Sequence, residues 1–546
     1  MENRSAKSSR RSFVNRAAKV AAGAVTLPGL FDGFAARAAN ERGREARIRG
    51  YGELKPAGNE LALPPGFQYS VVSFEGDLMA DGYPVPKAMD GMGAFPLSNG
   101  NIMLIRNHED SDAPSRLRPR PANSTSTSAG ILNSILDTHY GPRSFAYDKY
   151  AGGGTTSIEV EAGGSRRKVR EYWSLTGTVR NCAGGETPWG SWLSCEETFE
   201  AVATTGAEKN HGYVFEVPVN TLPGSPALAI PIKQMGRMAH EAAAVDPNTG
   251  IIYETEDQGD VSGFYRFAPL KKPTKPGELA TMGGSLEMMR VKGSDNYLTA
   301  INQKVGATLS VGWVKIVDPD PTPPTVVING VTWASVFKQG YDVGGAIFRR
   351  LEGIWYFKGK FYFSSTNGGN AGVGQIWLYD PVAETITLVY ESPGIHDLDF
   401  PDNIAVSPRG GIVICEDGAG SQFLRGLTPA GDIFDFARNI HNNLEMAGTC
   451  FSPDGQTMFV NLYGLGAVRT ITPMGTTLQF PVGAEANQKA LTLAIWGTGL
   501  FCRAIYSCTK DLIAARLVSR LPKTGIWSSS RNSGARWAME TCAIAL

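Results

Sequence analysis

Apolar and polar positions alternate along short segments from about residue 63 onward, and turn-forming residues separate these segments. Alternation with a period of two is typical of a β-strand that buries one face. The same unit, a strand, a turn with Asp, Pro, Asn or Gly, and a second strand, recurs at residues 242–257, 353–369, 403–418 and 450–462. The turn chemistry of each repeat predicts a β-hairpin.

The spacing of these hairpins indicates how they are arranged. Ser407-Pro408 and Ser452-Pro453 occupy the same place in the last two hairpins, about 45 residues apart, which is close to the length of a β-propeller blade. A sandwich with long loops is the alternative, but it gives no reason for the hairpin to return at this spacing. We therefore expect an all-β protein, a β-propeller with inserted loops and a few short helices.

Three segments do not fit a blade. Residues 111–150 hold a Ser-, Thr- and Pro-rich run with a short helical pattern at 131–137, and residues 270–345 are Pro-rich with charged patches. Both predict excursions that cover one face of the disc. Residues 500–546 lose the hairpin pattern, and we expect an atypical C-terminal tail there, with a disordered extension as one interpretation.

The N-terminus carries an export pattern. Arg10-Arg11, Phe13, a mildly apolar stretch to Phe31 and the small-residue site Ala36-Arg37-Ala38 follow one another in the order of a twin-arginine signal. We expect a signal peptide at 1–38, a linker at 39–60 and the propeller at 61–499. The expected partner is then the twin-arginine translocation machinery, and the mature protein would be periplasmic or secreted. No later stretch is apolar for long enough to span a bilayer.

Charge and cysteine content limit the partners and the covalent cross-links that can be expected. The formal net charge is zero and 19% of residues are charged, so no global bias favours nucleic acid as a partner. Seven cysteines are few and odd in number for an exported chain, so we expect no disulfide framework. Cys182 and Cys450 have apolar or Gly-rich neighbours and are expected to be small buried side chains. We also expect a monomer.

Acids stand where several strands end. Single acids at such places are usually solvated surface groups, but these recur in at least five hairpins, and strand ends of different blades converge on the channel of a propeller. Like charges brought together repel unless cations lie among them. The positions are Glu109-Asp110, Cys195-Glu196-Glu197, Glu241, Glu254, Glu256, Asp257, Glu352, Asp402, Glu416 and Asp417.

This set predicts a multi-metal centre. Carboxylate oxygens suit calcium, and one thiolate beside bridging carboxylates suits a transition ion such as iron. Cys195 is the candidate thiolate because it directly precedes two acids. His108 and His240 adjoin acids and are either ligands or hydrogen-bonded structural side chains.

Several longer motifs resemble the PhoX-type alkaline phosphatase family of exported bacterial enzymes. The resemblance runs from about Leu61 to Tyr463. Its most specific motifs are RNHED at 106–110, NCAGGETPWGSWLSCEETFE at 181–200, GRMAHEAAAVDP at 236–247, RLEGIWY at 350–356 and FPDNIAVSPRGG at 400–411.

The resemblance implies a propeller whose channel mouth holds iron and calcium and hydrolyses phosphate monoesters. It implies Cys195 as the thiolate ligand of iron, Arg350 as the arginine that binds the phosphate and Asn181 as a polar phosphate contact. The implied carboxylate ligands are Glu109, Glu196, Glu241, Asp257, Glu352 and Asp402.

Two other functions fit parts of the same pattern. One is a calcium-dependent propeller hydrolase, of the lactonase or phosphotriesterase type, which would have no use for a thiolate. The other is a non-catalytic calcium-binding propeller, in which Arg350 would have no role. The residues alone leave the elements open, because ligand spacing predicts ligands and not the identity of the metal.

Overall fold

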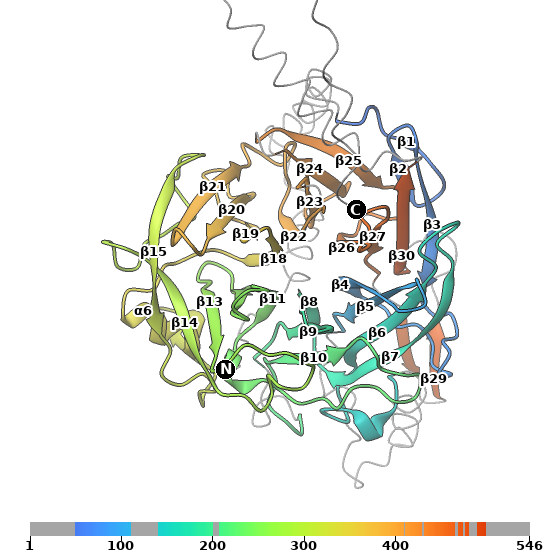
Figure 1. Ribbon diagram of the computed structural model, residues 1–546, viewed down its shortest axis with the longest axis horizontal. Coiled ribbons are helices and arrows are strands. Elements are labelled where there is room, and N and C mark those ends of the chain that lie inside the picture. Colours follow the sequence, from blue (N-terminus) through green and yellow to red (C-terminus); the bar gives the residue numbers. More distant parts are fainter. Residues whose placement is uncertain are drawn as a thin grey trace, which may run out of the picture.

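The computed structural model describes residues 50–110, 140–199, 207–408, 410–428, 431–464, 468–472, 475–479 and 489–497. Within these residues the protein is built from β-sheets arranged around one central axis (Figure 1). Six strands lie innermost, and each contacts the next so that the last returns to the first. They are β4 (Met89–Pro96), β8 (Asn181–Glu186), β11 (His240–Val245), β18 (Leu351–Phe357), β22 (Pro401–Val406) and β26 (Met446–Phe451).

Each innermost strand begins one blade, in which successive strands pair antiparallel outward. Blade one adds β5 (Ile102–His108), β6 (Gly153–Val160) and β7 (Lys168–Thr178), and blade two adds β9 (Ser191–Glu196) and β10 (Val214–Pro218). Blade three adds β12 (Ile252–Glu256), β13 (Phe264–Pro269) and β14 (Gly284–Val291). Blade four adds β19 (Lys360–Ser365), β20 (Gln375–Asp380) and β21 (Thr385–Glu391), and blade five adds β23 (Ile412–Glu416), β24 (Phe423–Leu427) and β25 (Ile433–Asn439).

Blade six closes the ring with strands from both ends of the chain. Its order is β26, β27 (Met458–Leu462), β30 (Leu491–Gly497) and β3 (Phe67–Phe74), so an early strand completes the last sheet. The short strands β1 (Lys55–Pro56) and β2 (Leu61–Leu63) extend blade five beyond β25. Because this sheet combines strands from both ends of the chain, it closes the ring of blades and leaves no free inner edge.

Local sequence explains the hairpins. The turn between β18 and β19 consists of Lys358 and Gly359, with φ of 48° and 83°. Positive φ at both central residues is the tight hairpin turn whose twist matches the strands. Innermost strands such as β11, with the sequence HEAAAV, are buried along their whole length because blades pack on both of their faces.

The four hairpins expected from the sequence are confirmed as β11–β12, β18–β19, β22–β23 and β26–β27. Residues 270–345 are not only an excursion: they include β14 and also β15 (Thr308–Lys315), which pairs with both β14 and β21 and so joins blades three and four. The rest of this segment forms the hairpin of β16 (Thr325–Ile328) and β17 (Val331–Ala334) and the helix α6 (Ser335–Asp342).

The other described elements are two short turns of helix, η2 (Arg143–Phe145) and η3 (Lys233–Met235), and the pair β28 (Val468–Thr472) and β29 (Gly475–Gln479). The expected signal peptide at 1–38, the helix at 131–137 and the tail at 500–546 lie outside the described residues. Among the described residues, no helix is both long enough and apolar enough to cross a membrane.

Candidate metal centre

A β-bulge interrupts the start of every innermost strand. In each case the register with the second strand shifts across two residues, which are Asp90-Gly91, Cys182-Ala183, Glu241-Ala242, Glu352-Gly353, Asp402-Asn403 and Gly448-Thr449. A bulge redirects the side chain that it carries and is common beside functional sites. Five of the six bulges begin with a carboxylate or a thiol, and the sixth begins with a glycine.

The second residue of most of these bulges is small, and this lets the innermost strands approach one another. Gly91, Ala183, Ala242 and Gly353 line a narrow pocket on the axis. A β-carbon at Gly91 would run into the backbone of Ala183, and one at Gly353 would run into the backbone of Asn403. The strands can therefore converge closely enough for their bulged side chains to meet.

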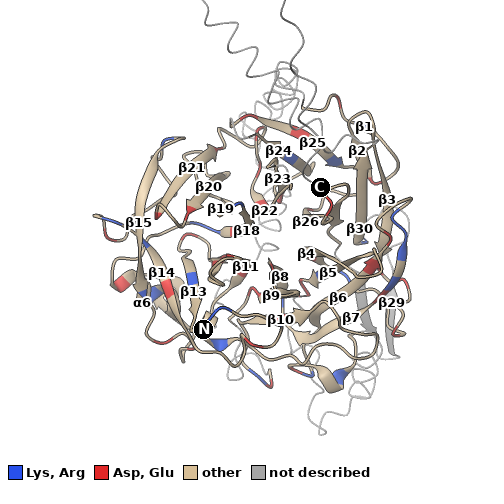
Figure 2. Ribbon diagram, viewed as in Figure 1, with Lys and Arg blue, Asp and Glu red and all other residues tan. Residues whose placement is uncertain are grey.

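Five of the bulged side chains and four further residues form an acidic cluster around the axis, called the acidic ring below. Glu109 follows β5, Glu197 follows β9, Asp417 follows β23 and Glu445 precedes β26. The ring consists of four overlapping groups whose ligand atoms lie within 4.8 Å of one another: Asp90, Glu109 and Cys182; Cys182, Glu197 and Glu241; Glu241, Glu352 and Asp402; and Asp402, Asp417 and Glu445. Figure 2 marks acidic positions in red beside the axis, near β8 and β22.

Burial makes the negative charge of this ring energetically costly, because the carboxylates are removed from water. Every member is buried except Asp417, which is half-buried. Cys182 Sγ donates a hydrogen bond to Glu197 Oε2 at 2.8 Å, so the thiol takes part directly in the ring. Eight buried or half-buried carboxylates side by side require compensating positive charge.

Arg350 supplies one such charge at the edge of the ring. Its Nη2 donates to Glu352 Oε1 at 2.6 Å, and its Nε lies 3.2 Å from Asp257 Oδ1. Its side chain is 18% exposed, so Arg350 is not sealed off from solvent. The backbone of Arg350 has φ of 38°, a left-handed conformation that is costly for a residue other than glycine and is often retained at functional sites.

Four of the expected metal ligands come together in the ring: Glu109, Glu241, Glu352 and Asp402. Cys195 does not. It belongs to a buried apolar cluster with Leu193, Val214 and Met238. Burial and the neighbouring Glu254 raise the pKa of the Cys195 thiol well above its usual range, which opposes the thiolate form. Cys182 occupies the place in the ring that the sequence suggested for Cys195.

Glu196 also lies outside the ring and has a structural environment. Its Oε1 accepts hydrogen bonds from the Val179 amide at 2.9 Å and from His211 Nδ1 at 2.7 Å. Its Oε2 accepts from the amides of Gly212 and Tyr213. With four donors around it, this carboxylate ties three chain segments together, and its neighbour Glu197 is the residue that reaches the ring.

The remaining expected residues have other partners. Asp257 contacts Arg350 and is not a member of the four groups. Asn181 is fully buried: its Oδ1 accepts from Thr178 and its Nδ2 donates to Ser194. His108 bonds the Lys87 carbonyl and Thr156, and burial lowers its pKa well below the usual value, so it is a neutral structural side chain. His240 lies 3.2 Å from Glu254.

Sequence reasoning missed Asp90, Cys182 and Glu445 as members of the ring, and Glu197 and Asp417 were noted only as strand-end acids. A usable signal exists for the first two. Asp90 and Cys182 stand directly before a small residue at the start of an innermost strand, as Glu241 and Glu352 do. The other three lie in the connections at the ends of strands, where no spacing rule identifies them.

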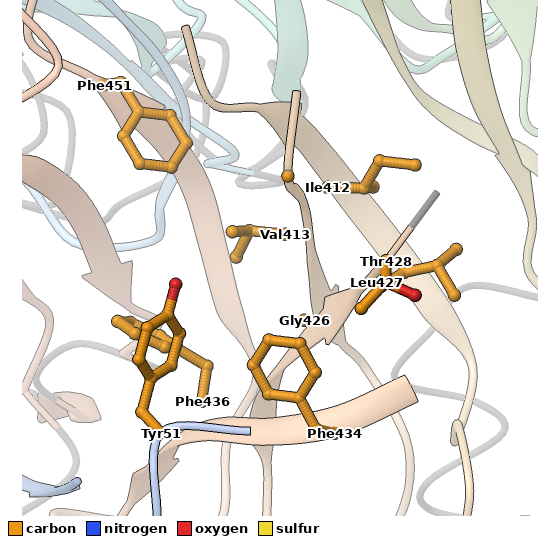
Figure 3. Close-up of a pocket in the computed structure, with 10 residues that line it drawn as sticks. Tyr51, Ile412, Val413, Gly426, Leu427, Thr428, Phe434, Phe436 and Phe451 are labelled. Carbon is orange, nitrogen blue, oxygen red and sulfur yellow. The ribbon is translucent and has the colours of Figure 1, made fainter. Parts of the chain in front are cut away.

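A second pocket lies within blade five, away from these acids. Figure 3 shows the rings of Tyr51, Phe434 and Phe436 around it, with Val413 and Leu427. Its lining is apolar and offers neither a charged group nor a metal ligand. The acidic ring is therefore the candidate functional site.

Comparisons with known proteins show the family and the fold of this chain. The family model described as alkaline phosphatase PhoX matches residues 49–466. The structure of Pseudomonas fluorescens PhoX in complex with vanadate, a transition state analogue, is 17% identical, with a TM-score of 0.57 over 82% of this chain and 97% of that chain. A gluconolactonase from Xanthomonas campestris, 11% identical, gives a TM-score of 0.33 over 81% of this chain and 99% of that chain, too distant to bear on function. No curated protein matches the chain.

The match to the family model spans more than half of the chain, and the structural match supports the propeller fold. The chain belongs to the PhoX family of alkaline phosphatases, which confirms the family, the β-propeller and the phosphoric monoester hydrolase expected from its sequence.

Proposed function

We propose that the protein hydrolyses phosphate monoesters at the acidic ring, with a mixed iron and calcium centre, and releases inorganic phosphate. The observation that carries this proposal is the convergence of eight carboxylates and one thiol from six blades, with Arg350 at their edge. A monoester dianion needs cations and bidentate donors around its non-bridging oxygens, and this is the place in the molecule where both can be supplied.

The donor set fits two kinds of metal. Around Cys182, one thiol and the carboxylates of Asp90, Glu109, Glu197 and Glu241 suit iron, which accepts mixed sulfur and oxygen ligands. On the other side, Glu352, Asp402, Asp417 and Glu445 offer oxygens alone, which suit calcium. When bound, such metals polarise phosphoryl oxygens and lower the pKa of coordinated water.

The chain's own residues bind and orient the ester. Arg350 presents its guanidinium at the solvent edge of the ring, where two of its donors can meet two phosphate oxygens. Asp257 and Glu352 hold that guanidinium from behind and limit its rotation. This arrangement places the phosphate over the ring before reaction, which lowers the entropic part of the barrier.

Export is part of the same proposal. The twin-arginine pattern at residues 1–38 supports translocation of the folded, metal-loaded protein to the periplasm or cell exterior. Phosphate esters that cannot enter the cell would then be the accessible substrates. A monomer remains our expectation.

The test is elemental analysis by inductively coupled plasma mass spectrometry together with hydrolysis of 4-nitrophenyl phosphate. We expect both iron and calcium in the purified protein, and activity that is lost on dialysis against EDTA and restored when both metals are returned. A protein that binds calcium alone and does not hydrolyse the ester would contradict the proposal and favour a calcium-dependent hydrolase of another class or a binding propeller.

A further inference from the structure

A left-handed backbone conformation recurs just before several residues of the acidic ring. In four of the six blades, the residue two positions before the bulged ligand has a left-handed backbone: Ala88 at 52°, Arg180 at 52°, Arg350 at 38° and Phe400 at 54°. This conformation is unfavourable in residues with a β-carbon. Because the conformation recurs two residues before the bulge, the chain enters the innermost strand in the same way in these four blades.

Two of these four positions carry arginine, and their surroundings match. Arg350 precedes Glu352, and Arg180 precedes Cys182. The Arg180 amide donates to the Asp110 carbonyl at 3.1 Å, and its carbonyl accepts from the Glu197 amide at 2.9 Å, so its backbone is fixed on both sides. The Arg350 amide and carbonyl are likewise bonded, to Gly259 and Thr366.

The two guanidinium groups also have comparable places beside the ring. Arg180 Nη1 donates to the Glu197 carbonyl at 3.4 Å and lies 4.0 Å from Glu197 Oε2, the oxygen that accepts from Cys182. Its side chain is 26% exposed, against 18% for Arg350, so both groups combine a carboxylate contact with access to solvent.

Position in the ring places the two arginines on either side of Glu241. Glu197, which Arg180 contacts, shares one group with Glu241, and Glu352, which Arg350 contacts, shares the next group with Glu241. An anion bound over Glu241 and its metals would therefore have a guanidinium on each side. Three non-bridging oxygens of a phosphate monoester exceed what one bidentate arginine can engage.

We propose that Arg180 is a second substrate-binding arginine, which contacts the phosphate group of the monoester together with Arg350. The inference rests on the proposed phosphatase function and adds a residue to it. Arginine, and not lysine, is required at this position because a planar fork can keep one contact with Glu197 while directing its other donors to phosphate oxygens.

The experiment compares Arg180→Met and Arg180→Lys with the unmutated protein and with Arg266→Met. Arg266 is a matched control: its side chain is 24% exposed and pairs with one carboxylate, Glu287, but it lies on β13, outside the two inner strands of its blade. The measurements are the inhibition constants of vanadate and inorganic phosphate, kcat/KM for 4-nitrophenyl phosphate, and iron and calcium content.

We expect inhibition by vanadate and by phosphate to weaken about 10- to 100-fold in Arg180→Met, the range for loss of charged hydrogen bonds. Arg180→Lys, which keeps the charge beside Glu197, should show a smaller but clear loss with full metal content. Arg266→Met should behave like the unmutated protein. The lysine variant keeps the test decisive if the methionine variant does not fold.

Unchanged inhibition constants in both Arg180 variants, with the unmutated protein active, would overturn this inference and leave the proposed function intact. Loss of iron in Arg180→Lys would also overturn it, because Arg180 would then act by holding Glu197 and not by binding substrate. If the unmutated, metal-loaded protein neither binds phosphate nor hydrolyses the ester, the proposed function itself fails.

Discussion

Cys182 and Cys195 are both fully buried, but their neighbours give the two thiols different chemistry. Cys182 donates to Glu197 within the acidic ring, whereas Cys195 packs among apolar side chains. We predict that Cys182→Ser removes most of the bound iron and lowers activity by about 100-fold or more, because even outer partners of metal sites cost 10- to 100-fold. Iron content and 4-nitrophenyl phosphate hydrolysis measure this.

Cys195→Ser is the matched control for that substitution. It should keep iron and activity but lower the free energy of unfolding by about 1 to 3 kcal/mol, because it buries a hydroxyl in an apolar cluster. The assignment of the thiolate to Cys182 would be refuted by the opposite pattern, in which Cys195→Ser loses iron and Cys182→Ser retains it.

His211 is a fully buried ring between two carboxylates, Glu196 at 2.7 Å and Asp148 at 3.5 Å. Burial alone would lower its pKa, but the charges of Glu196 and Asp148 outweigh burial and raise the pKa to about 9. The unfolded value is about 6.5, so the folded state binds the extra proton between these pH values. Its contribution to stability is therefore complete below about pH 6.5 and is lost as the pH rises through about 9.

We predict that His211→Gln destabilises the protein by more at pH 6.5 than at pH 10, by an amount on the order of 3 kcal/mol. Urea unfolding of the unmutated and variant proteins at both pH values measures this difference, and groups common to both proteins cancel. An equal difference at the two pH values would show that the ring is not charged in the folded state.

The sequence predicted the carboxylates of this site better than its thiol, for a physical reason. Acids at strand ends, such as Glu241 and Glu352, are conspicuous because charged groups are unusual beside buried segments. Cys182 looked like a small buried residue, and its role depends on a bulge that turns it toward the ring. Adjacency favoured Cys195 and Glu196, but Cys195 packs in an apolar cluster and Glu196 is held by four hydrogen-bond donors, so only their neighbour Glu197 reaches the ring.

At the scale of the element, the six bulges are equivalent, but the sixth begins with Gly448 where the others begin with a carboxylate or a thiol. Its φ is 60°, and a β-carbon there would run into the Asp90 carbonyl and the Asn461 amide group. Its amide donates to Asn403 Oδ1 at 2.7 Å, and Asn403 Nδ2 donates to Asp402 Oδ1 at 2.8 Å. Gly448 therefore lets blade six pack between two ligand-bearing bulges.

We predict that Gly448→Ala lowers the free energy of unfolding by more than about 2 kcal/mol, because the left-handed backbone and the clash of the added carbon both destabilise the folded state. It should also weaken metal binding, because Asp90 must move. Gly359→Ala is the control: φ is 83° there, but no atom lies within 4 Å of the added carbon, so about 1 kcal/mol is expected. Equal losses of stability, measured by urea unfolding, would mean that the contact with Asp90 is unimportant.

Elements were predictable where both faces of a strand, or one complete face, are buried. The four innermost hairpins show regular patterns and turn residues and were found from the sequence. The outer strands β14 and β15 were not, because their burial is irregular and polar or exposed residues interrupt the pattern.

At the scale of the molecule, the acidic ring draws a side chain from every blade, so bound cations would connect the whole propeller. Without cations the same buried carboxylates repel one another. We predict that EDTA lowers Tm by several degrees, because a ligand at 100 times its Kd stabilises the folded state by about 2.7 kcal/mol. Differential scanning calorimetry before and after dialysis, and after return of calcium and iron, measures this.

Glu241→Gln separates attraction to cations from repulsion among acids, because Glu241 belongs to two of the four groups. In the metal-loaded protein the substitution removes a ligand and should lower Tm. In the EDTA-treated protein it removes one of several repelling charges and should raise Tm. A change of the same sign in both states would indicate that Glu241 acts through packing alone. Opposite changes in Tm are expected only if the buried charge of the ring is tolerated when metal is bound and destabilising when it is not. Because the ring draws side chains from all six blades, the Tm of this single variant reports on the whole propeller.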